Sequence, residues 1–306
     1  MMQEPGPVTC RAPGLAVVVP TYNEAANVAE IVRRVGAALA GIDWELIFVD
    51  DDSPDETWRL ARNIAQDDRR VRVLQRVGRR GLSSACIEGM LATAAPFIAV
   101  IDGDLQHDET LLPQMLAVLK GEDLDIAVGS RYVAGGGVGD WDARRQSMSR
   151  LAGAIGRRLI KADLKDPMSG FFMLRAGLLQ DCVRGLSGVG YKILLDIFAS
   201  CPKPPRFKEL PYEFRLRTAG ASKLDKAVLW EYLLMVLQKL LGPLIPIRFI
   251  AFSLIGGLGV FVHLAVLWAL YKQAGLDFVT GQSAAALVAM TSNFFLNNLL
   301  TYRDMR

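Results

Sequence analysis

Short apolar runs alternate with helix-like stretches along the first 130 residues of the chain. Five runs read as buried strands: Leu15–Pro20, Glu45–Asp50, Val71–Gln75, Phe97–Asp102 and Asp125–Gly129. Helical patterns fall between them, near residues 25–40, 56–66, 83–94 and 109–120. Continuous apolar strands separated by helices are typical of a parallel sheet that is covered on both faces. The pattern therefore predicts an α/β domain with a mostly parallel sheet.

The last sixty residues have a different pattern, with long runs that carry no charge. One uncharged run of 23 residues lies between Arg248 and Lys272, and a second covers Phe278–Tyr302. At about 1.5 Å per residue the first run spans roughly 34 Å as a helix, enough to cross a bilayer. The polar linker Lys272–Asp277 is short, so we predict a hairpin of two transmembrane helices. A buried helix pair of a soluble domain is the alternative.

The charges that flank this hairpin predict its orientation. Lys239 and Arg248 precede the first span, Arg303 and Arg306 follow the second, and a single lysine lies in the linker. Positive residues are enriched on the cytoplasmic side of membrane proteins. We therefore expect a multi-pass protein of the cell (inner) membrane, with the soluble domain on the cytoplasmic face.

Polar and small residues inside the spans suggest contacts between helices. His263 lies in the first span, and we expect a neutral histidine bonded to a neighbouring helix, a functional role being the alternative. Gly256, Gly257 and Gly259 suit close helix packing, within one subunit or in a homo-oligomer.

Residues 223–241, before the first span, mix charged with large apolar side chains and end near Pro243. They read as an amphipathic helix in the membrane interface, or alternatively as a surface helix of the soluble domain. We accordingly divide the chain into an N-terminal tail (1–14), a catalytic domain (15–222), an interfacial segment (223–246) and a transmembrane hairpin (247–306).

The composition of the chain argues against several classes of function. The formal charge of +3 is too small to favour nucleic acid, although residues 69–80 carry six arginines. That basic run is either a solvated strand edge or an anion-binding surface. The four cysteines lack C-x-x-C spacing and the chain has only two histidines, which disfavours a zinc site or a disulfide framework. The first 14 residues do not resemble a signal peptide, so we expect reduced thiols in the cytoplasm.

Three polar segments directly follow predicted strands: Pro20–Glu24, Asp50–Asp55 and Asp102–His107. In open α/β sheets, ligands bind beyond the carboxyl ends of the strands, where these segments are expected to meet. Neither a G-x-G-x-x-G sequence after the first strand nor a P-loop sequence is present, so phosphates must be bound differently. The segment Asp50–Asp55 could also be an Asx-rich turn that caps the following helix.

Asp102, Asp104 and Gln106 are a candidate metal site. In an extended backbone, residues two apart share a face, so two carboxylates and one amide oxygen would converge on one cation. Ligands that are all oxygen suit Mg²⁺ or Mn²⁺, which complete their coordination with substrate phosphate. Such a cation would stabilise the charge on a departing nucleoside diphosphate.

Six motifs together resemble the polyprenyl- and dolichyl-phosphate mannose synthases, family 2 glycosyltransferases with the GT-A fold. They are PTYNE (20–24), VDDDSPDET (49–57), DGDLQH (102–107), GSRYV (129–133), DPMSGFF (166–172) and GASKL (220–224). The resemblance covers residues 15–240, and the hairpin resembles the membrane domain of some members. It implies transfer of mannose from GDP-mannose to a polyprenyl or dolichyl phosphate, with inversion. A UDP-glucose-dependent enzyme with the same acceptor is the alternative.

The resemblance also implies roles for individual residues. Pro20, Tyr22, Glu24, Val49 and Asp51 would hold the nucleoside, and Asp102, Gly103, Asp104 and Gln106 the metal and diphosphate. Arg131, Arg145 and Ser149 would bind the acceptor phosphate and, with Asp104, form the catalytic set. Arg131 would also contact the donor, Arg217 and Lys223 would close over its diphosphate, and Asp166 and Ser169 would shape the sugar pocket. Exposed helix arginines are the competing interpretation of Arg131 and Arg145.

The expected acceptor simplifies the chemistry. A phosphate oxygen is already an anion at neutral pH, so no general base is required to activate it. The reaction reduces to an in-line displacement that depends on positioning and charge stabilisation. Two rival functions are a processive polysaccharide synthase and a catalytically silent module that binds nucleotide sugar. The first is disfavoured because the chain lacks Q-x-x-R-W and has few spans, the second because the acidic and basic site residues are intact.

Overall fold

The computed structural model describes residues 12–139, 153, 156–157, 160, 162–188, 190–215, 226–241 and 247–301. These residues form two compact units. The first contains the described residues up to Gly188 together with residues 192–215. The second contains residues 190–191, 226–241 and 247–301, and each unit is described by itself.

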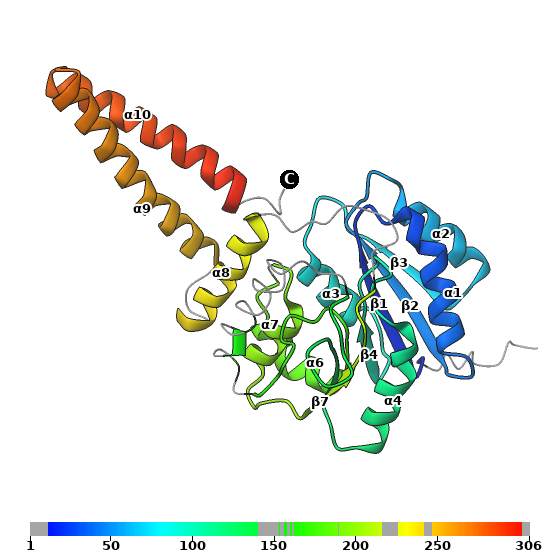
Figure 1. The fold of residues 1–306 in the computed structure, drawn as a ribbon. Helices are drawn as coiled ribbons and strands as arrows, with labels where there is room; N and C mark the ends of the chain where they lie inside the picture. The colour runs from blue at the N-terminus through cyan, green and yellow to red at the C-terminus, as the bar shows by residue number, and fades with distance from the viewer. Residues whose placement is uncertain are drawn as a thin grey trace, which may run out of the picture. The chain divides into compact units, whose positions relative to one another are not determined.

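The first unit is built on one seven-stranded sheet (Figure 1). Its strands are β1 (Leu15–Thr21), β2 (Trp44–Asp50), β3 (Val71–Gln75), β4 (Phe97–Val100), β5 (Ile126–Ser130), β6 (Phe172–Arg175) and β7 (Phe207–Pro211). Their order is β3-β2-β1-β4-β6-β5-β7. β6 pairs antiparallel with β4 and β5, whereas the other described pairings are parallel. The mostly parallel α/β sheet that the sequence predicts is confirmed.

Helices cover both faces of this sheet, as expected for strands whose side chains are buried on either side. They are α1 (Val28–Ala38), α2 (Thr57–Asp67), α3 (Leu82–Leu91), α4 (Leu112–Gly121), α6 (Ala176–Cys182) and α7 (Ile193–Ser200). Apolar residues of α1, α2 and α4 join alternate residues of the central strands in one core. α3 packs against β1 and β2 and also contacts α7. The predicted helices are confirmed with ends shifted by a few residues.

Strand register defines the edge at which the candidate site lies. Thr21 at the end of β1 pairs with Asp50 at the end of β2. Because β6 is antiparallel, its first residue, Phe172, lies beside the end of β4 and beside Val128 of β5. The segment that precedes β6 therefore reaches the same edge as the segments that follow β1, β2, β4 and β5.

The second unit contains α8 (Lys226–Leu241), α9 (Ile247–Trp268) and α10 (Phe278–Leu296). Short π-helical segments, Ala269–Gln273 and Asn297–Thr301, continue α9 and α10. Within the part of the chain that the structure describes, one helix, Phe249–Gln273, is long and apolar enough to cross a membrane. The predicted second crossing coincides with α10, which forms as a helix but does not meet that criterion, so it stays a prediction.

Contacts between α9 and α10 explain the polar and small residues of this region. His263 Nε2 lies 3.3 Å from Gln282 Oε1, which agrees with the histidine-to-helix bond expected from the sequence. A Cβ atom on Gly259 would lie 2.4 Å from the Asn293 side chain, so only glycine permits this approach. Large apolar side chains such as Phe261 and Met290 are exposed along both helices, as they would be against lipid tails.

Candidate active site

The segments that follow β1 and β2 are held together by hydrogen bonds. The backbone N–H groups of Asn23 and Glu24 donate to Ser53 Oγ and Thr57 Oγ1, each at 3.0 Å. Asp50 is fully buried, and its carboxylate accepts from Thr21 Oγ1 at 2.8 Å and from Ser53. These bonds join the PTYNE and DDDSPD motifs in one surface.

The aspartates of the second motif have separate tasks. Asp55 Oδ1 accepts from the backbone and hydroxyl of Thr57, the first residue of α2, which is the helix-capping role considered for this segment. Asp51 instead has its carboxylate enclosed. Its Oδ1 accepts from Arg76 Nη1 at 2.7 Å and its Oδ2 from the Gly81 N–H at 2.7 Å. Burial raises the pKa of Asp51, opposed by the Gly81 bond and the Arg76 charge.

Arg76 is the largest fully buried side chain of the described residues and was not identified from the sequence. Besides Asp51, it binds Gly81 O at 3.1 Å and Ser84 Oγ at 2.6 Å. Other arginines of the basic run lie at the surface: Arg70, Arg72 and Arg79 pair with Asp68, Glu45 and Glu88. β3 is an edge strand, so most of the run is a solvated strand edge while Arg76 supports the candidate nucleoside site.

The acidic motif after β4 is a turn, and the extended backbone predicted for it is wrong. Leu105 has φ +61°, in the left-handed region that a bulky residue rarely adopts. The turn allows the Gln106 N–H to donate to Asp104 Oδ1 at 3.2 Å. Asp104 and Gln106 are more than nine-tenths buried, whereas the side chain of Asp102 is one-third exposed.

The donor atoms of this turn fit a hard divalent cation. No cluster of three or more His, Cys, Asp or Glu side chains suited to a metal occurs among the described residues, and the predicted set contains two carboxylates and an amide. Gln106 Nε2 donates to the carbonyl of Arg215 at 2.9 Å, so the oxygen of the amide is turned away from that carbonyl. Two carboxylates and an amide oxygen suit Mg²⁺ or Mn²⁺.

Two glycines bring neighbouring segments against this turn. A Cβ on Gly103 would lie 3.1 Å from the Thr21 side chain and 3.6 Å from Glu24 Cγ, so the turn touches the first motif. A Cβ on Gly170 would lie 2.8 Å from Asp102 Oδ2, so the DPMSG motif packs directly on the candidate ligand. The first motif and the acidic turn thus meet beyond the carboxyl ends of β1 and β4, as predicted, and the DPMSG motif joins them there, which was not predicted.

His107 packs against the turn and supports it. Its Nδ1 accepts from the Asp102 N–H at 3.1 Å, which places the ring proton on Nε2, 3.7 Å from Asp102 Oδ2. The ring stacks on Phe171 with centroids 5.2 Å apart. Burial lowers the pKa of His107 to about 4, although the Asp104 carboxylate opposes the shift, so the ring is neutral at pH 7. No pattern in the sequence indicates a role for this residue.

Arg131 and Asp166 form a buried ion pair across 35 residues of sequence. Arg131 Nε and Nη2 each donate to an Asp166 oxygen at 2.8 Å, and the Arg131 N–H adds a third bond at 3.1 Å. Burial alone would lower the pKa of Arg131, but Asp166 outweighs it and raises that pKa. Ser169 donates to Gly129 O at 2.7 Å and so fixes the turn before β6. Arg131 is therefore held rigidly and is not a solvent-exposed helix arginine.

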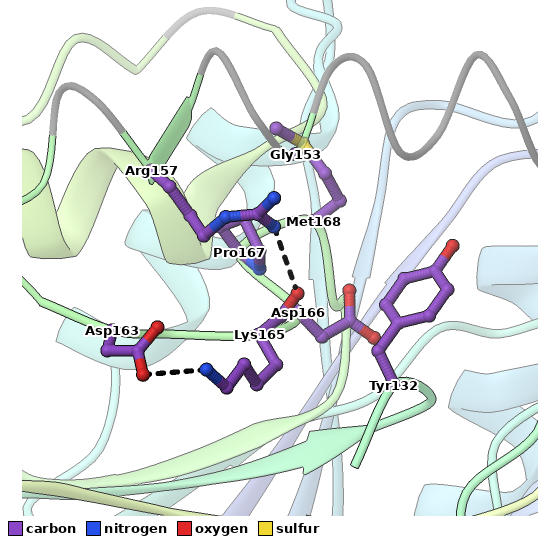
Figure 2. A pocket seen from close by; sticks show the side chains of 8 residues that line it. All are labelled: Tyr132, Gly153, Arg157, Asp163, Lys165, Asp166, Pro167 and Met168. Atoms are coloured by element: carbon purple, nitrogen blue, oxygen red, sulfur yellow. Dashed lines mark hydrogen bonds and ion pairs between the residues drawn. The ribbon is translucent and has the colours of Figure 1, made fainter.

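A cavity of about 300 Å³ lies beside this ion pair (Figure 2). Asp166 and Tyr132 line it together with two basic residues, Arg157 and Lys165. Arg157 Nη1 donates to the Lys165 carbonyl at 3.5 Å, and the Lys165 ammonium pairs with Asp163 at 2.6 Å. Arg157 and Lys165 lie shortly before the DPMSG motif in the sequence, and this proximity could have identified them as candidate site residues.

The remaining candidate residues fall into three groups. Tyr22 is partly buried, and the guanidinium of Arg80 lies 4.8 Å from the centroid of its ring. Pro20 and Val49 are buried residues near the ends of β1 and β2. Arg145, Ser149, Arg217 and Lys223 lie outside the described residues.

Comparisons with known proteins show the family to which the chain belongs. Residues 16–183 match the family described as glycosyl transferase family 2, and residues 251–306 match the GtrA/DPMS transmembrane domain. The chain is 36% identical over 296 residues to a dolichol-phosphate mannosyltransferase of Pyrococcus furiosus, covering 95% of this chain and 82% of that protein. It is 36% identical over 227 residues to a dolichol-phosphate mannosyltransferase of Saccharomyces cerevisiae, covering 71% and 84%.

Solved structures share the fold at low sequence identity. Glucosyl-3-phosphoglycerate synthase from Mycobacterium tuberculosis, in complex with Mn²⁺, UDP and glucosyl-3-phosphoglycerate, superposes with a TM-score of 0.56. The two chains are 19% identical over 79% of this chain and 88% of that one. At this identity the likeness supports the sheet and helix arrangement alone.

Proposed function

The chain belongs to glycosyl transferase family 2, and from that premise we propose that it transfers mannose from GDP-mannose to a polyprenyl phosphate, with inversion at the anomeric carbon. One observation carries this proposal. Similarity to a dolichol-phosphate mannosyltransferase extends over 95% of the chain and so includes both the soluble and the C-terminal unit. The mannosyltransferase relatives favour mannose over the UDP-glucose alternative.

At the donor end, we assign the nucleoside to the surface formed by the first two motifs. Tyr22 and Glu24 would contact the base, and Asp51, held by Arg76, would accept from ribose hydroxyls. Asp102, Asp104 and Gln106 would hold a divalent cation, Mg²⁺ or Mn²⁺, which supplies Lewis-acid stabilisation of the departing diphosphate. The oxygen donors of these three side chains are the support for this assignment.

At the acceptor end, the ion pair with Asp166 fixes the guanidinium of Arg131 in one orientation. We assign to Arg131 the electrostatic attraction of the acceptor phosphate, and to Arg145 and Ser149 direct bonds to it. Charge that is fixed before the substrate arrives needs no reorganisation during the reaction. The phosphate oxygen attacks as an anion, so no residue of this site is required to remove a proton.

We assign Arg217 and Lys223 to the donor end, where they would close over the diphosphate of GDP-mannose.

The C-terminal unit would anchor the enzyme in the membrane, where its lipid acceptor is found. We propose a multi-pass arrangement in which α9 and α10 both cross the bilayer and the catalytic unit faces the cytoplasm. α8 would lie in the membrane interface.

Incubation of the full-length protein in detergent with GDP-mannose, polyprenyl phosphate and Mn²⁺ tests the proposal. We expect a mannosyl-lipid in organic extracts, no product when EDTA is added, and at least a hundredfold loss in Asp104→Asn. The formation of a glucosyl-lipid from UDP-glucose, with no product from GDP-mannose, would refute the mannose assignment. Binding of GDP-mannose with no product from either donor would instead identify a silent binding module.

A further inference from the structure

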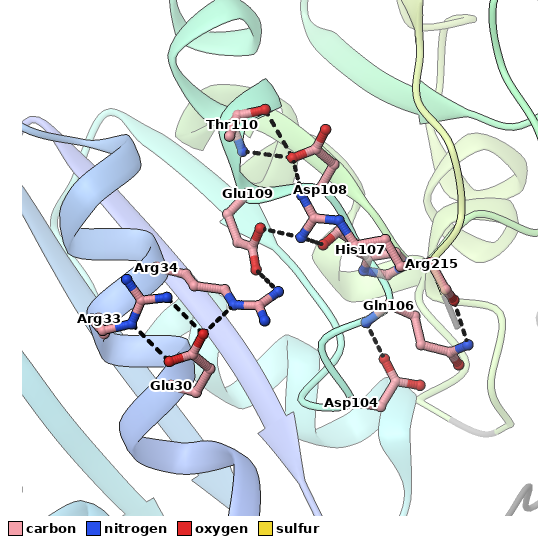
Figure 3. A network of polar contacts seen from close by, with 10 residues as sticks. All are labelled: Glu30, Arg33, Arg34, Asp104, Gln106, His107, Asp108, Glu109, Thr110 and Arg215. Atoms are coloured by element: carbon pink, nitrogen blue, oxygen red, sulfur yellow. Dashed lines mark hydrogen bonds and ion pairs between the residues drawn. The ribbon is translucent and has the colours of Figure 1, made fainter. Parts of the chain in front are cut away.

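The chain that follows β7 returns to the acidic turn and pairs with it (Figure 3). The Arg215 N–H donates to Gln106 O at 2.9 Å, and Gln106 Nε2 donates to Arg215 O at 2.9 Å. Two reciprocal bonds thus join a candidate cation ligand to a residue 109 positions away. Neither the motifs nor the proposed mechanism assigns a role to Arg215.

The side chain of Arg215 donates hydrogen bonds to the residues that follow Gln106 in the same turn. Its Nη1 donates to Glu109 Oε2 at 2.7 Å and to His107 O at 3.3 Å, while its Nη2 donates to Asp108 Oδ1 at 2.7 Å. Glu109 is more than nine-tenths buried, whereas the arginine is 37% exposed. One guanidinium therefore contacts three consecutive residues directly after Gln106.

This cluster is anchored to the helical layer as well. The second oxygen of Glu109 accepts from Arg34 of α1 at 3.4 Å. Arg34 in turn donates to Glu30 at 2.6 Å. Glu109 consequently has both oxygens bound to arginines from two distant segments, and the turn is fixed between α1 and the end of β7.

A fixed turn matters here because its backbone is strained. Leu105 holds a left-handed conformation that a bulky L-residue rarely adopts, so the turn relaxes unless its surroundings hold it. Contacts to Gln106, His107, Asp108 and Glu109 hold the turn immediately after that residue. Loss of the Arg215 side chain removes three of them at once.

We propose that Arg215 is a positioning residue for the divalent cation. It holds the acidic turn so that the Gln106 amide keeps its nitrogen on the Arg215 carbonyl and its oxygen available as a ligand. The inference rests on the proposed function, since it requires that Asp102, Asp104 and Gln106 bind a cation. It adds a residue from a segment that the recognised motifs do not include.

Mn²⁺ binding to the full-length protein in detergent, followed by the electron paramagnetic resonance signal of free Mn²⁺, tests this role without turnover. We expect about a tenfold weaker affinity in Arg215→Ala, the scale seen when supports of metal ligands are removed. Arg33→Ala is the matched control, because Arg33 is an exposed arginine that pairs with Glu30 but not with the turn. Its Mn²⁺ affinity should equal that of the wild type.

GDP binding separates positioning from a general loss of structure. In EDTA, GDP affinity of Arg215→Ala should match the wild type, and the gain in affinity on adding Mn²⁺ should shrink about tenfold. Equal Mn²⁺ affinity in folded Arg215→Ala and Arg33→Ala would overturn the inference. If Arg215→Ala does not fold, a folded Arg215→Met with wild-type Mn²⁺ affinity overturns it equally, because the methionine side chain has no hydrogen-bond donor. A wild type that binds neither Mn²⁺ nor GDP would remove the proposed function as well.

Discussion

Acidification should destabilise this protein through His107. The pKa of the ring is about 4 in the fold and 6.5 in an unfolded chain, because burial disfavours the charged form. A depressed histidine pKa contributes stability above pH 6.5 that is lost as the pH falls towards 4, since the unfolded state then binds the extra proton. Between pH 7 and pH 5 these two pKa values give a loss of about 2 kcal/mol.

Thermal unfolding of the full-length protein in detergent at pH 7 and pH 5 measures this loss. A change of about 2 kcal/mol lowers the melting temperature of a chain of this size by roughly 4 °C. His107→Asn is the informative variant, because asparagine offers an oxygen to the Asp102 N–H and does not titrate. Without the ring stacking on Phe171, the variant should be less stable at both pH values. Its pH-dependent loss should largely disappear.

Asp51, whose pKa burial raises, is unchanged in His107→Asn, so its contribution is the same in both proteins and cancels in the comparison. An equal fall in wild type and His107→Asn would refute the assignment of a buried neutral imidazole.

Three further substitutions test other contacts. Gly170→Ala should reduce the transfer rate about a hundredfold, because the added methyl group would displace Asp102, a candidate cation ligand. Gly177→Ala is the control, since open space surrounds Gly177 and the rate should not change. Steady-state kinetics measure both rates. Asp166→Asn should cost about 3–5 kcal/mol in unfolding experiments because Arg131 keeps a buried charge without its partner. Gly259→Leu should lower the melting temperature by forcing α9 and α10 apart while GDP affinity stays at the wild-type value.

The parts of the site that the sequence predicts are those governed by short-range patterns. Apolar runs locate five strands, and the rule for open α/β sheets then brings the polar segments that follow them together. β6 was not predicted because its four residues carry no clear alternation, and its antiparallel direction depends on pairing with β4 and β5. Placing DPMSG beside Asp102 required that direction.

Long-range pairing and unusual backbone account for the rest. Six arginines occur between residues 69 and 80, and the sequence does not distinguish among them. The structure shows that Arg76 is the one that binds Asp51, a residue 25 positions away. An extended segment was the natural expectation for the acidic motif, since leucine seldom adopts positive φ. The structure places Asp102, Asp104 and Gln106 in a turn, so the alternation of an extended strand does not bring their side chains together, and their role as cation ligands stays a prediction.

The direction of β6 has a consequence for how such enzymes diversify. Because β6 runs antiparallel to β4 and β5, its first residue lies at the edge of the sheet where those two strands end. The segment that joins β5 to β6 therefore begins and ends at the same edge. Changes in its length or sequence can be accommodated without altering the pairing of the seven strands.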